Sequence, residues 1–219
     1  MMKKLVFVFA ICVFAAGTAS ADFNVTFTGQ GTGNMVYDSP VVYTGPVIGG
    51  DLVPGTWTIS IDDTGWPPTT NPTARWDYIW NTFYEYTPAN PPIIPDAVWT
   101  ATFDTPLTAS RPALFLDHQG TGTMSGVADM RFQVIDADGD MVLDPDECDG
   151  DGLSGIVIII EDGTDYYADQ CGNGSYQGGY TRNCSTWDDN VVFQMSIDLW
   201  PCGMAAEPAS WGAIKALYQ

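Results

Sequence analysis

One stretch decides the fold class: Val191-Val-Phe-Gln-Met-Ser-Ile-Asp-Leu199. Every second residue in it is apolar, and this period of two is typical of a β-strand with one buried face. The same alternation occurs over residues 23–28, 57–62 and 132–134. Ile156–Ile160 is instead a continuous run of β-branched and apolar residues, which predicts a strand buried on both faces.

Glycine and proline interrupt these strands throughout, for example at Gly45-Pro46, Pro67-Pro68 and Gly178-Gly179. Many short strands separated by such turns, with almost no helical periodicity, predict an all-β fold. We expect a single antiparallel β-sandwich or jelly roll over residues 22–204, since that length suits one domain with a sizeable core.

Residues 75–86 fit two structures. As a strand, they place Trp76, Tyr78 and Trp80 on one face, whereas as a helix they place Trp76, Trp80 and Phe83 in one stripe. Aromatic residues are enriched in strands, so the sequence favours a strand.

The aromatic residues of this region have two possible roles. Exposed on a flat β face, Trp76, Tyr78 and Trp80 would stack on sugar rings, and Trp66, before two prolines, is a further candidate for exposure. Buried, the same rings would fill the core that a sandwich needs. The first role predicts a carbohydrate-binding module.

Residues 1–21 have the pattern of a secretory signal peptide. Lys3 and Lys4 precede the apolar stretch Leu5–Ala16, and Ala19-Ser-Ala21 fits a cleavage site. The apolar run is too short for a membrane anchor. We therefore expect export from a bacterium to the cell surface or beyond it.

The chain is strongly acidic, with 27 Asp and Glu against 7 Lys and Arg and a net charge of −20. Such a surface repels nucleic acid and attracts divalent cations. Nucleic acid is therefore excluded as a partner, and no segment after the signal peptide has the length to span a membrane.

Four cysteines follow the signal peptide, and an even count in an exported chain favours two disulfides. We expect Cys171–Cys184 to close the glycine-rich segment between them, and Cys148–Cys202 to tie an acidic loop to the last strand. A zinc site built from the four thiolates is the alternative, but no Cys-x-x-Cys pair supports it.

The densest acidic segment is Asp136–Glu147. Oxygen ligands fall at positions 1, 3, 5, 7, 9 and 12 of this twelve-residue loop, the spacing of a calcium loop. The predicted ligands are the carboxylates of Asp136, Asp138, Asp140, Asp144 and Glu147, with the carbonyl oxygen of Val142. Calcium is favoured over magnesium because a flexible polycarboxylate loop supplies six to eight oxygens in loose geometry.

This loop resembles an EF-hand or dockerin loop, and residues 136–148 are also similar to a thrombospondin type 3 repeat, which combines aspartates with a cysteine. Two features depart from the EF-hand pattern. Met141 stands at the sixth position, where a glycine is usual, although Gly139 can supply part of the bend. Strand patterns flank the loop on both sides, so we expect a calcium loop that joins two strands.

Residues 205–219 differ from the rest of the chain. They predict a linker followed by a short helix, with Trp211, Ile214 and Leu217 on one face. This tail is expected either to pack on its own domain or to serve as a sorting or docking tag. At the other end, Asn24 lies in Asp22-Phe-Asn-Val-Thr26, which fits a bacterial glycosylation acceptor.

Catalysis has little support in the sequence. His118 is the only histidine, and no nucleophile motif accompanies it. We predict an exported, non-enzymatic, calcium-stabilised β-sandwich that acts as a structural or adhesive subunit. Its partners would be surface glycans, or a second copy that exchanges strand 23–28 to build a fibre. A carbohydrate-binding module and a secreted hydrolase are the alternatives.

Overall fold

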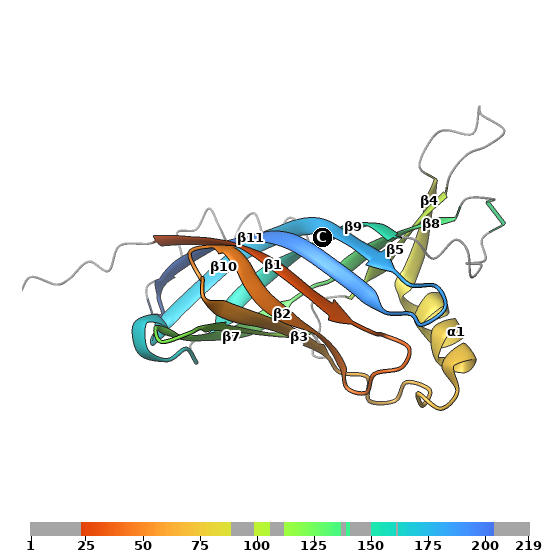
Figure 1. Ribbon diagram of the computed structural model, residues 1–219, viewed down its shortest axis with the longest axis horizontal. Coiled ribbons are helices and arrows are strands. Elements are labelled where there is room, and N and C mark those ends of the chain that lie inside the picture. The colour runs from red at the N-terminus through yellow and green to blue at the C-terminus, as the bar shows by residue number, and fades with distance from the viewer. Residues whose placement is uncertain are drawn as a thin grey trace, which may run out of the picture.

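The computed structural model describes residues 23–88, 99–105, 112–136, 139–140, 150–160 and 162–203. The predicted signal peptide and the tail 205–219 lie outside these residues. The elements, shown in Figure 1, are β1 (Phe23–Gly33), β2 (Val41–Gly50), β3 (Gly55–Ile61), α1 (Pro72–Phe83), β4 (Tyr84–Pro88), β5 (Trp99–Asp104), β6 (Ala113–His118), β7 (Gly122–Ala128), β8 (Arg131–Asp136), β9 (Gly150–Ile160), η1 (Asp165–Tyr167), β10 (Gln170–Arg182) and β11 (Asp189–Pro201).

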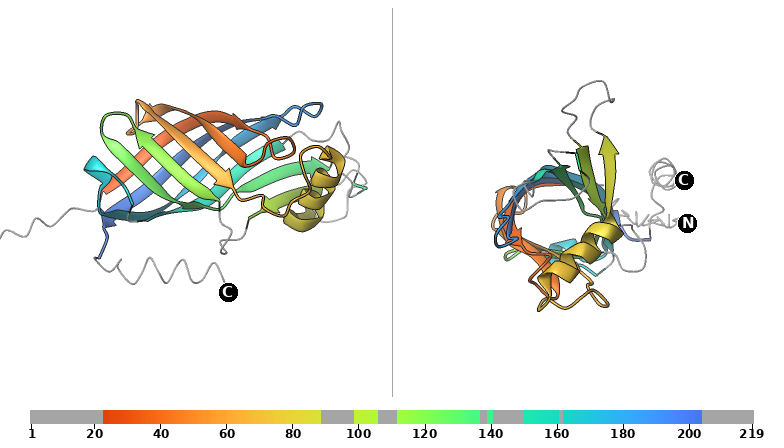
Figure 2. Two further views of the ribbon diagram at one scale, coloured as in Figure 1. Left: turned by 90° about the horizontal axis from the view of Figure 1, so that it is seen from below. Right: turned by 90° about the vertical axis from the view of Figure 1, so that its right-hand side faces the viewer.

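Eight antiparallel strands close into a barrel, in the order β10-β11-β1-β2-β3-β6-β7-β9, with β9 pairing back to β10. β9 changes partner along one of its edges. Its residues 157–160 pair with β7 in the barrel, whereas its residues 150–154 pair with β8. Beyond β8 the order continues through β5 to β4, and this β8-β5-β4 extension projects from the barrel (Figure 2). We call it the projecting sheet.

The predicted all-β, antiparallel class is confirmed, but the molecule is a barrel where a sandwich or jelly roll was expected. Alternation specifies which face of a strand is buried. A sheet that closes on itself and two sheets that pack together bury that face equally well. Only the pairing of β9 with β10 distinguishes them, and no local pattern encodes it.

Side chains fill the interior of the barrel. The five inward residues of β11, expected from the alternation, are all buried: Val191, Phe193, Met195, Ile197 and Leu199. Aromatic rings pack between them, as where Trp57 meets Phe193 edge to face at 4.8 Å between centroids. Such pairs add about 0.5–1.5 kcal/mol to the gain from burial alone.

The continuous apolar run of β9 is buried on one face only. Val157 and Ile159 point inward and are buried, whereas Ile156 and Ile158 are half-buried and Ile160 is 46% exposed. The prediction of a strand buried on both faces is therefore wrong. A barrel has a single interior, so only one face of β9 packs into the core that the described residues form.

Residues 75–83 form the end of helix α1, so the predicted strand begins only at Tyr84. The helix starts where Asn71 Oδ1 accepts a hydrogen bond from the Ala74 amide at 3.3 Å, and Pro72 occupies its first turn. Both features are typical of a helix N-terminus. Arg75 anchors the helix by donating to the Met35 carbonyl oxygen at 2.8 Å and to Asp63 at 2.7 Å.

A buried ion pair lies near this end of the barrel. Arg182 donates through Nε and Nη2 to the carboxylate of Asp189 at 2.6 and 3.1 Å, and the Tyr43 hydroxyl donates to the same carboxylate at 2.5 Å. The rings of Trp76 and Trp187 lie 5.5 and 5.9 Å from the guanidinium carbon. Burial and the adjacent Asp189 charge raise the pKa of Tyr43 well above its ordinary value.

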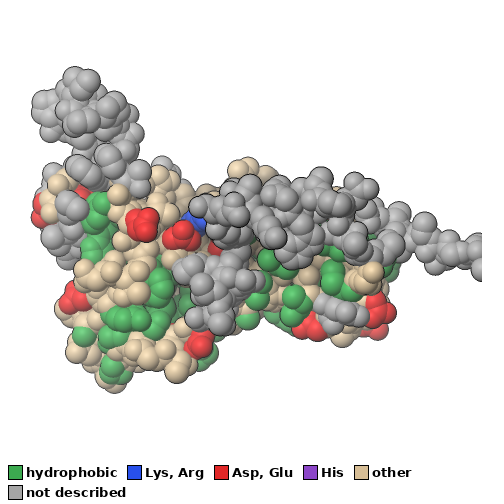
Figure 3. Space-filling view, turned by 180° about the vertical axis from the view of Figure 1, so that it is seen from behind, with side chains coloured by type: hydrophobic (Ala, Val, Ile, Leu, Met, Phe, Trp, Pro, Cys, Tyr) green, Lys and Arg blue, Asp and Glu red, His purple; other side chains and the backbone are tan. Residues whose placement is uncertain are grey.

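On the face shown in Figure 3, the described residues carry more acidic than basic side chains, and hydrophobic side chains gather in separate groups. Among the described residues, α1 is the one α-helix, and no helix there combines the length and hydropathy needed to cross a membrane.

Candidate functional site

A groove of about 710 Å³ runs over the outside of the barrel. It crosses β1, β11, β10 and β9 and ends at the base of β8, where the projecting sheet leaves the barrel. Its lining side chains that carry polar groups are Thr26, Thr28, Asp129, Arg131, Ser154, Ser175, Tyr176, Gln177, Gln194 and Ser196.

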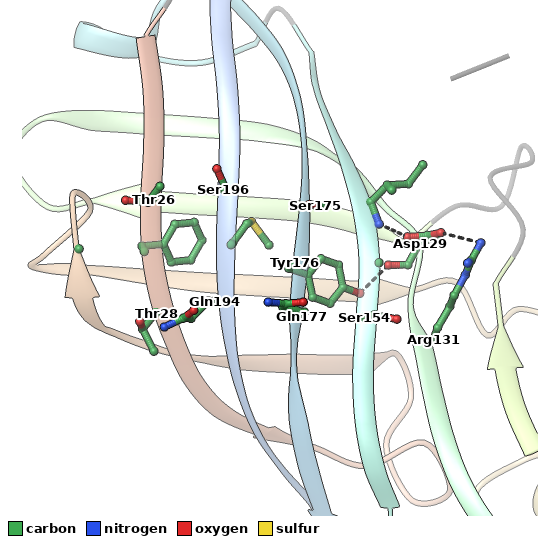
Figure 4. A pocket seen from close by; sticks show the side chains of 15 residues that line it. Thr26, Thr28, Asp129, Arg131, Ser154, Ser175, Tyr176, Gln177, Gln194 and Ser196 are labelled. Carbon is green, nitrogen blue, oxygen red and sulfur yellow. Dashed lines mark hydrogen bonds and ion pairs between the residues drawn. The ribbon is translucent and has the colours of Figure 1, made fainter. Parts of the chain in front are cut away.

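Strand pairing arranges most of these groups in two rows (Figure 4). One row holds Thr26, Ser196 and Ser175, and the other holds Thr28, Gln194, Gln177 and Ser154. Neighbours in a row are one strand apart, about 4.7–4.9 Å, and the two rows are two residues apart along each strand, about 7 Å. The groove therefore presents a regular grid of hydroxyl and amide groups.

Backbone pairing holds this grid in place. β1 pairs with β11 over the whole of Phe23–Gly33, and β10 pairs with β11 over the whole of Gln170–Arg182. The side chains on the opposite face of the same strands, including Phe27, Met195 and Tyr176, are buried in the core. Rotation of a strand would expose these residues to water, so the outward direction of the polar side chains is fixed by the core.

The end of the groove carries the charged residues. Asp129, 2% exposed, lies between β7 and β8, where the partner of β9 changes from one to the other, and its carboxylate accepts a hydrogen bond from the Ile156 amide. Arg131 Nη2 lies 3.5 Å from the same carboxylate, and the Tyr176 hydroxyl donates to the Asp129 carbonyl oxygen at 2.5 Å. Burial raises the pKa of Asp129, although the Ile156 amide and Arg131 partly oppose it.

Gly155 is required at this junction. A side chain there would collide with the Asp129 backbone and with the ring of Tyr176.

The predicted calcium loop falls only partly within the described residues. Asp136, at the end of β8, is buried and its Oδ1 accepts a hydrogen bond from the Gly139 amide at 2.7 Å. Gly139 has φ +76°, so it makes the bend that the sequence assigned to it. The remaining predicted ligands, except Asp140, lie outside the described residues: Asp138, Val142, Asp144 and Glu147.

The strands predicted on both sides of this loop are confirmed. They are β8 and β9, which pair with each other as a hairpin, with Arg131 opposite Ser154. Within the described part of the chain, His, Cys, Asp and Glu side chains form no group of three that could hold a metal. Calcium at residues 136–147 stays a prediction.

The four aromatic candidates do not form a flat β face. Trp66 packs against Tyr78 at 6.0 Å between ring centroids, and the Arg75 guanidinium lies 5.0 Å from its ring. Trp76 and Trp80, from successive turns of α1, lie 5.9 Å apart. All four are half-buried, which fits their alternative role in the packing of α1.

Cys171 forms a disulfide with Cys202, so the expected pairings Cys171–Cys184 and Cys148–Cys202 are wrong. Cys171, the second residue of β10, pairs with Trp200 of β11, which brings it beside Cys202. Cys184 is also disulfide-bonded, and Cys148 lies outside the described residues. Proximity along the chain favoured the wrong partner because the pairing of β10 with β11 was not known from the sequence.

Two further residues that the sequence singled out, Asn24 and His118, have defined contacts in the structure. Asn24 is exposed on β1, and its amide donates to Ser196 at 3.0 Å and to Asp198 at 2.8 Å. His118 Nδ1 lies 2.9 Å from the Tyr167 hydroxyl, at the end of β6. These contacts give His118 a structural role between β6 and η1.

The groove was not predicted from the sequence, although the sequence does contain some of its polar lining residues. Gln194, Ser196 and Asp198 are polar outward residues of the alternating stretch Val191–Leu199. Their neighbours across β1 and β10 are more than fifteen residues away in sequence, so the grid became visible only with the strand order.

No protein-family model, curated protein or solved structure matches this chain.

Proposed function

We propose that this protein is an exported, non-enzymatic adhesive protein that binds an uncharged, hydroxyl-rich ligand, an oligosaccharide, in the groove on the outside of the barrel. The single observation that carries this proposal is the double row of hydroxyl and amide side chains across β1, β11 and β10. The site differs from the aromatic face that the sequence indicated.

The chemistry of the rows suits a sugar. Each serine or threonine hydroxyl can both donate and accept, and each glutamine amide offers two donors and an acceptor. Sugars present the same mixture of donors and acceptors. The groove lining has one carboxylate and one guanidinium, and these already face each other, so most of the surface is neutral.

The groove is also wide and preformed. About 710 Å³ accommodates a ligand of several rings, and binding to strands held by a core orders few new groups. Each hydrogen bond to the ligand contributes only about 0.5–1.5 kcal/mol net, because water competes for the same groups. We therefore expect several weak contacts along the rows, as suits adhesion with many copies at a surface.

Calcium would act on this site through the β8–β9 hairpin. The base of the hairpin supplies Arg131 and Ser154 to the groove, and its other end carries the predicted ligands 136–147. A bound ion would hold the hairpin closed and so support one end of the groove. This role is structural and needs only the affinity of about 10⁻⁴–10⁻³ M common to extracellular calcium modules.

The test is calorimetric titration of the protein with neutral oligosaccharides of several linkages, after a glycan array has ranked them. The double variant Gln177→Ala and Gln194→Ala should bind about 5- to 100-fold more weakly, since two hydrogen-bonding amides are lost. Gln30→Ala, which removes an exposed glutamine of β1 outside the groove, is the matched control and should bind normally. Equal affinity of the double variant and the control would refute the site.

Assembly by strand exchange is the second candidate. β1 pairs along both edges, with β11 and β2, so β1 from a second copy could form the same pairs after the barrel opened. Electron microscopy of the purified protein, with and without calcium, would show fibres if this exchange occurs. Monodisperse monomers under both conditions would exclude it.

A further inference from the structure

An apolar strip lies on the outside of the barrel, next to the groove. It is formed by outward residues of β9, β7 and β6: Ile156, Ile158, Ile160, Val127 and Phe115. Ile160 and Phe115 are 46% and 43% exposed. Strand pairing places Val127 beside Ile158, and Ser125 between Phe115 and Ile160, so the apolar groups form one surface.

A shallow hollow of about 280 Å³ adjoins this strip. It crosses from Ile156 and Ile158 of β9, over Asn173 of β10, to Ser196 and Asp198 of β11. The described chain ends just beyond β11, at Gly203. The hollow therefore leads from the strand that precedes the last residues of the chain to the apolar strip.

We propose that residues 210–218 of the same chain dock on this strip as a short helix, with Trp211, Ile214, Leu217 and Tyr218 facing Ile156, Ile158 and Ile160. The helix and the apolar strip match in length. Nine helical residues extend about 13 Å, and Ile156 to Ile160 spans four strand positions, also about 13 Å.

The chain can reach the strip. Cys202 is disulfide-bonded to Cys171 of β10, which lies one strand from β9, so the tail leaves the barrel about 10 Å from the strip. Residues 204–209 span up to about 20 Å when extended. Two helical turns are not stable alone in water, so docking supplies the stability that the segment needs.

Charge also favours residues 210–218 as the segment that covers the apolar strip. Residues 210–218 contain no acid and one base, Lys215, in a protein of net charge −20. The hollow that leads to the strip carries the carboxylate of Asp198. A second copy of the barrel would instead bring another acidic surface to the strip.

The test is amide hydrogen–deuterium exchange of the full chain, read on peptides that cover residues 210–218. Docking predicts exchange at least tenfold slower than in a free peptide of the same sequence. The slow exchange should be lost in Ile158→Ser and in Leu217→Ser. It should persist in Val192→Ser, which replaces an exposed β-branched residue of β11 outside the strip.

Two results would overturn the proposal. One is exchange of residues 210–218 at the rate of the free peptide in the unsubstituted protein. The other is slow exchange that depends on protein concentration, together with a dimer in sedimentation, since this would show that a second copy covers the strip. Barrel peptides in the same data report whether each variant remains folded, so loss of docking and loss of folding are distinguished.

Discussion

Replacing Asp189 by asparagine tests the buried ion pair with a minimal change of shape. The Asp189 carboxylate is fully buried and accepts three hydrogen bonds, two from Arg182 and one from Tyr43. Asparagine keeps the size but removes the charge, and its amide nitrogen faces a donor. The Arg182 guanidinium is then left in the core without a counter-charge.

The expected loss follows from these contacts. Removing one partner of a buried ion pair typically costs about 3–5 kcal/mol, because the remaining charge is desolvated and uncompensated. Domains of this size have a total stability of about 5–15 kcal/mol. The melting temperature should therefore fall by about 6–20 °C. The rings of Trp76 and Trp187 near Arg182 reduce the loss only in part.

The measurement is urea denaturation followed by tryptophan fluorescence. Asp198→Asn is the control, since Asp198 is exposed and accepts a hydrogen bond only at the surface, from Asn24. The combined replacement Arg182→Met, Asp189→Leu and Tyr43→Phe should recover most of the lost stability, because it removes both charges and the three side chains that hydrogen-bond to one another. A loss below about 1 kcal/mol in Asp189→Asn, similar to the control, would refute this account of the network.

Three further predictions concern other elements. Asp129→Asn should make the protein more stable relative to the native chain as pH rises. Burial raises the pKa of Asp129, so the contribution of its protonated carboxyl group to stability is complete below the unfolded pKa and is lost as pH rises through the folded pKa. Parallel stability–pH curves for the two proteins would contradict this. Chelation of calcium should lower the melting temperature by about 5–10 °C from its value at a calcium concentration 100-fold above Kd. Asp138→Ala should abolish this difference between the calcium-bound and chelated protein, and an unchanged melting temperature on chelation would exclude the calcium loop. Asn71→Ala should destabilise the protein by about 1 kcal/mol in urea denaturation through loss of the α1 cap, whereas the exposed Asn81→Ala should have a smaller effect.

The sequence predicts the strands well because alternation is a local property. The inward residues of β11, and the flanking of residues 136–147 by β8 and β9, needed no knowledge of distant contacts. Helix α1 also has a local signal, Asn71-Pro72 at its start, which the prediction of a strand from aromatic composition did not consider. A cap with proline behind it fixes the start of a helix directly, whereas aromatic residues are common wherever a core is present.

The remaining features depend on contacts between residues far apart in the chain. The disulfide from Cys171 to Cys202 follows from the alignment of β10 with β11, and the groove follows from the neighbours that β11 acquires on both sides. Closure of the barrel has the same origin, since β9 must meet β10. Each of these pairings is stabilised by backbone hydrogen bonds that any residue except proline can make. The residue types of a strand therefore give little information about which strand it pairs with.

The position of β9 determines how calcium and the groove would be coupled. The barrel closes through the pairs of β9 with β10 and β7, and none of these pairs involves β8. The hairpin that carries residues 136–147 joins the projecting sheet to the barrel, since Leu153 and Ser154 pair with β8 on one edge and with β10 on the other. It lines the groove at Arg131, Ser154 and the junction around Asp129. Loss of calcium would therefore loosen the projecting sheet and one end of the groove while the barrel stays closed. A chelated protein should lose affinity for the proposed oligosaccharide at temperatures where the core around β11 remains folded.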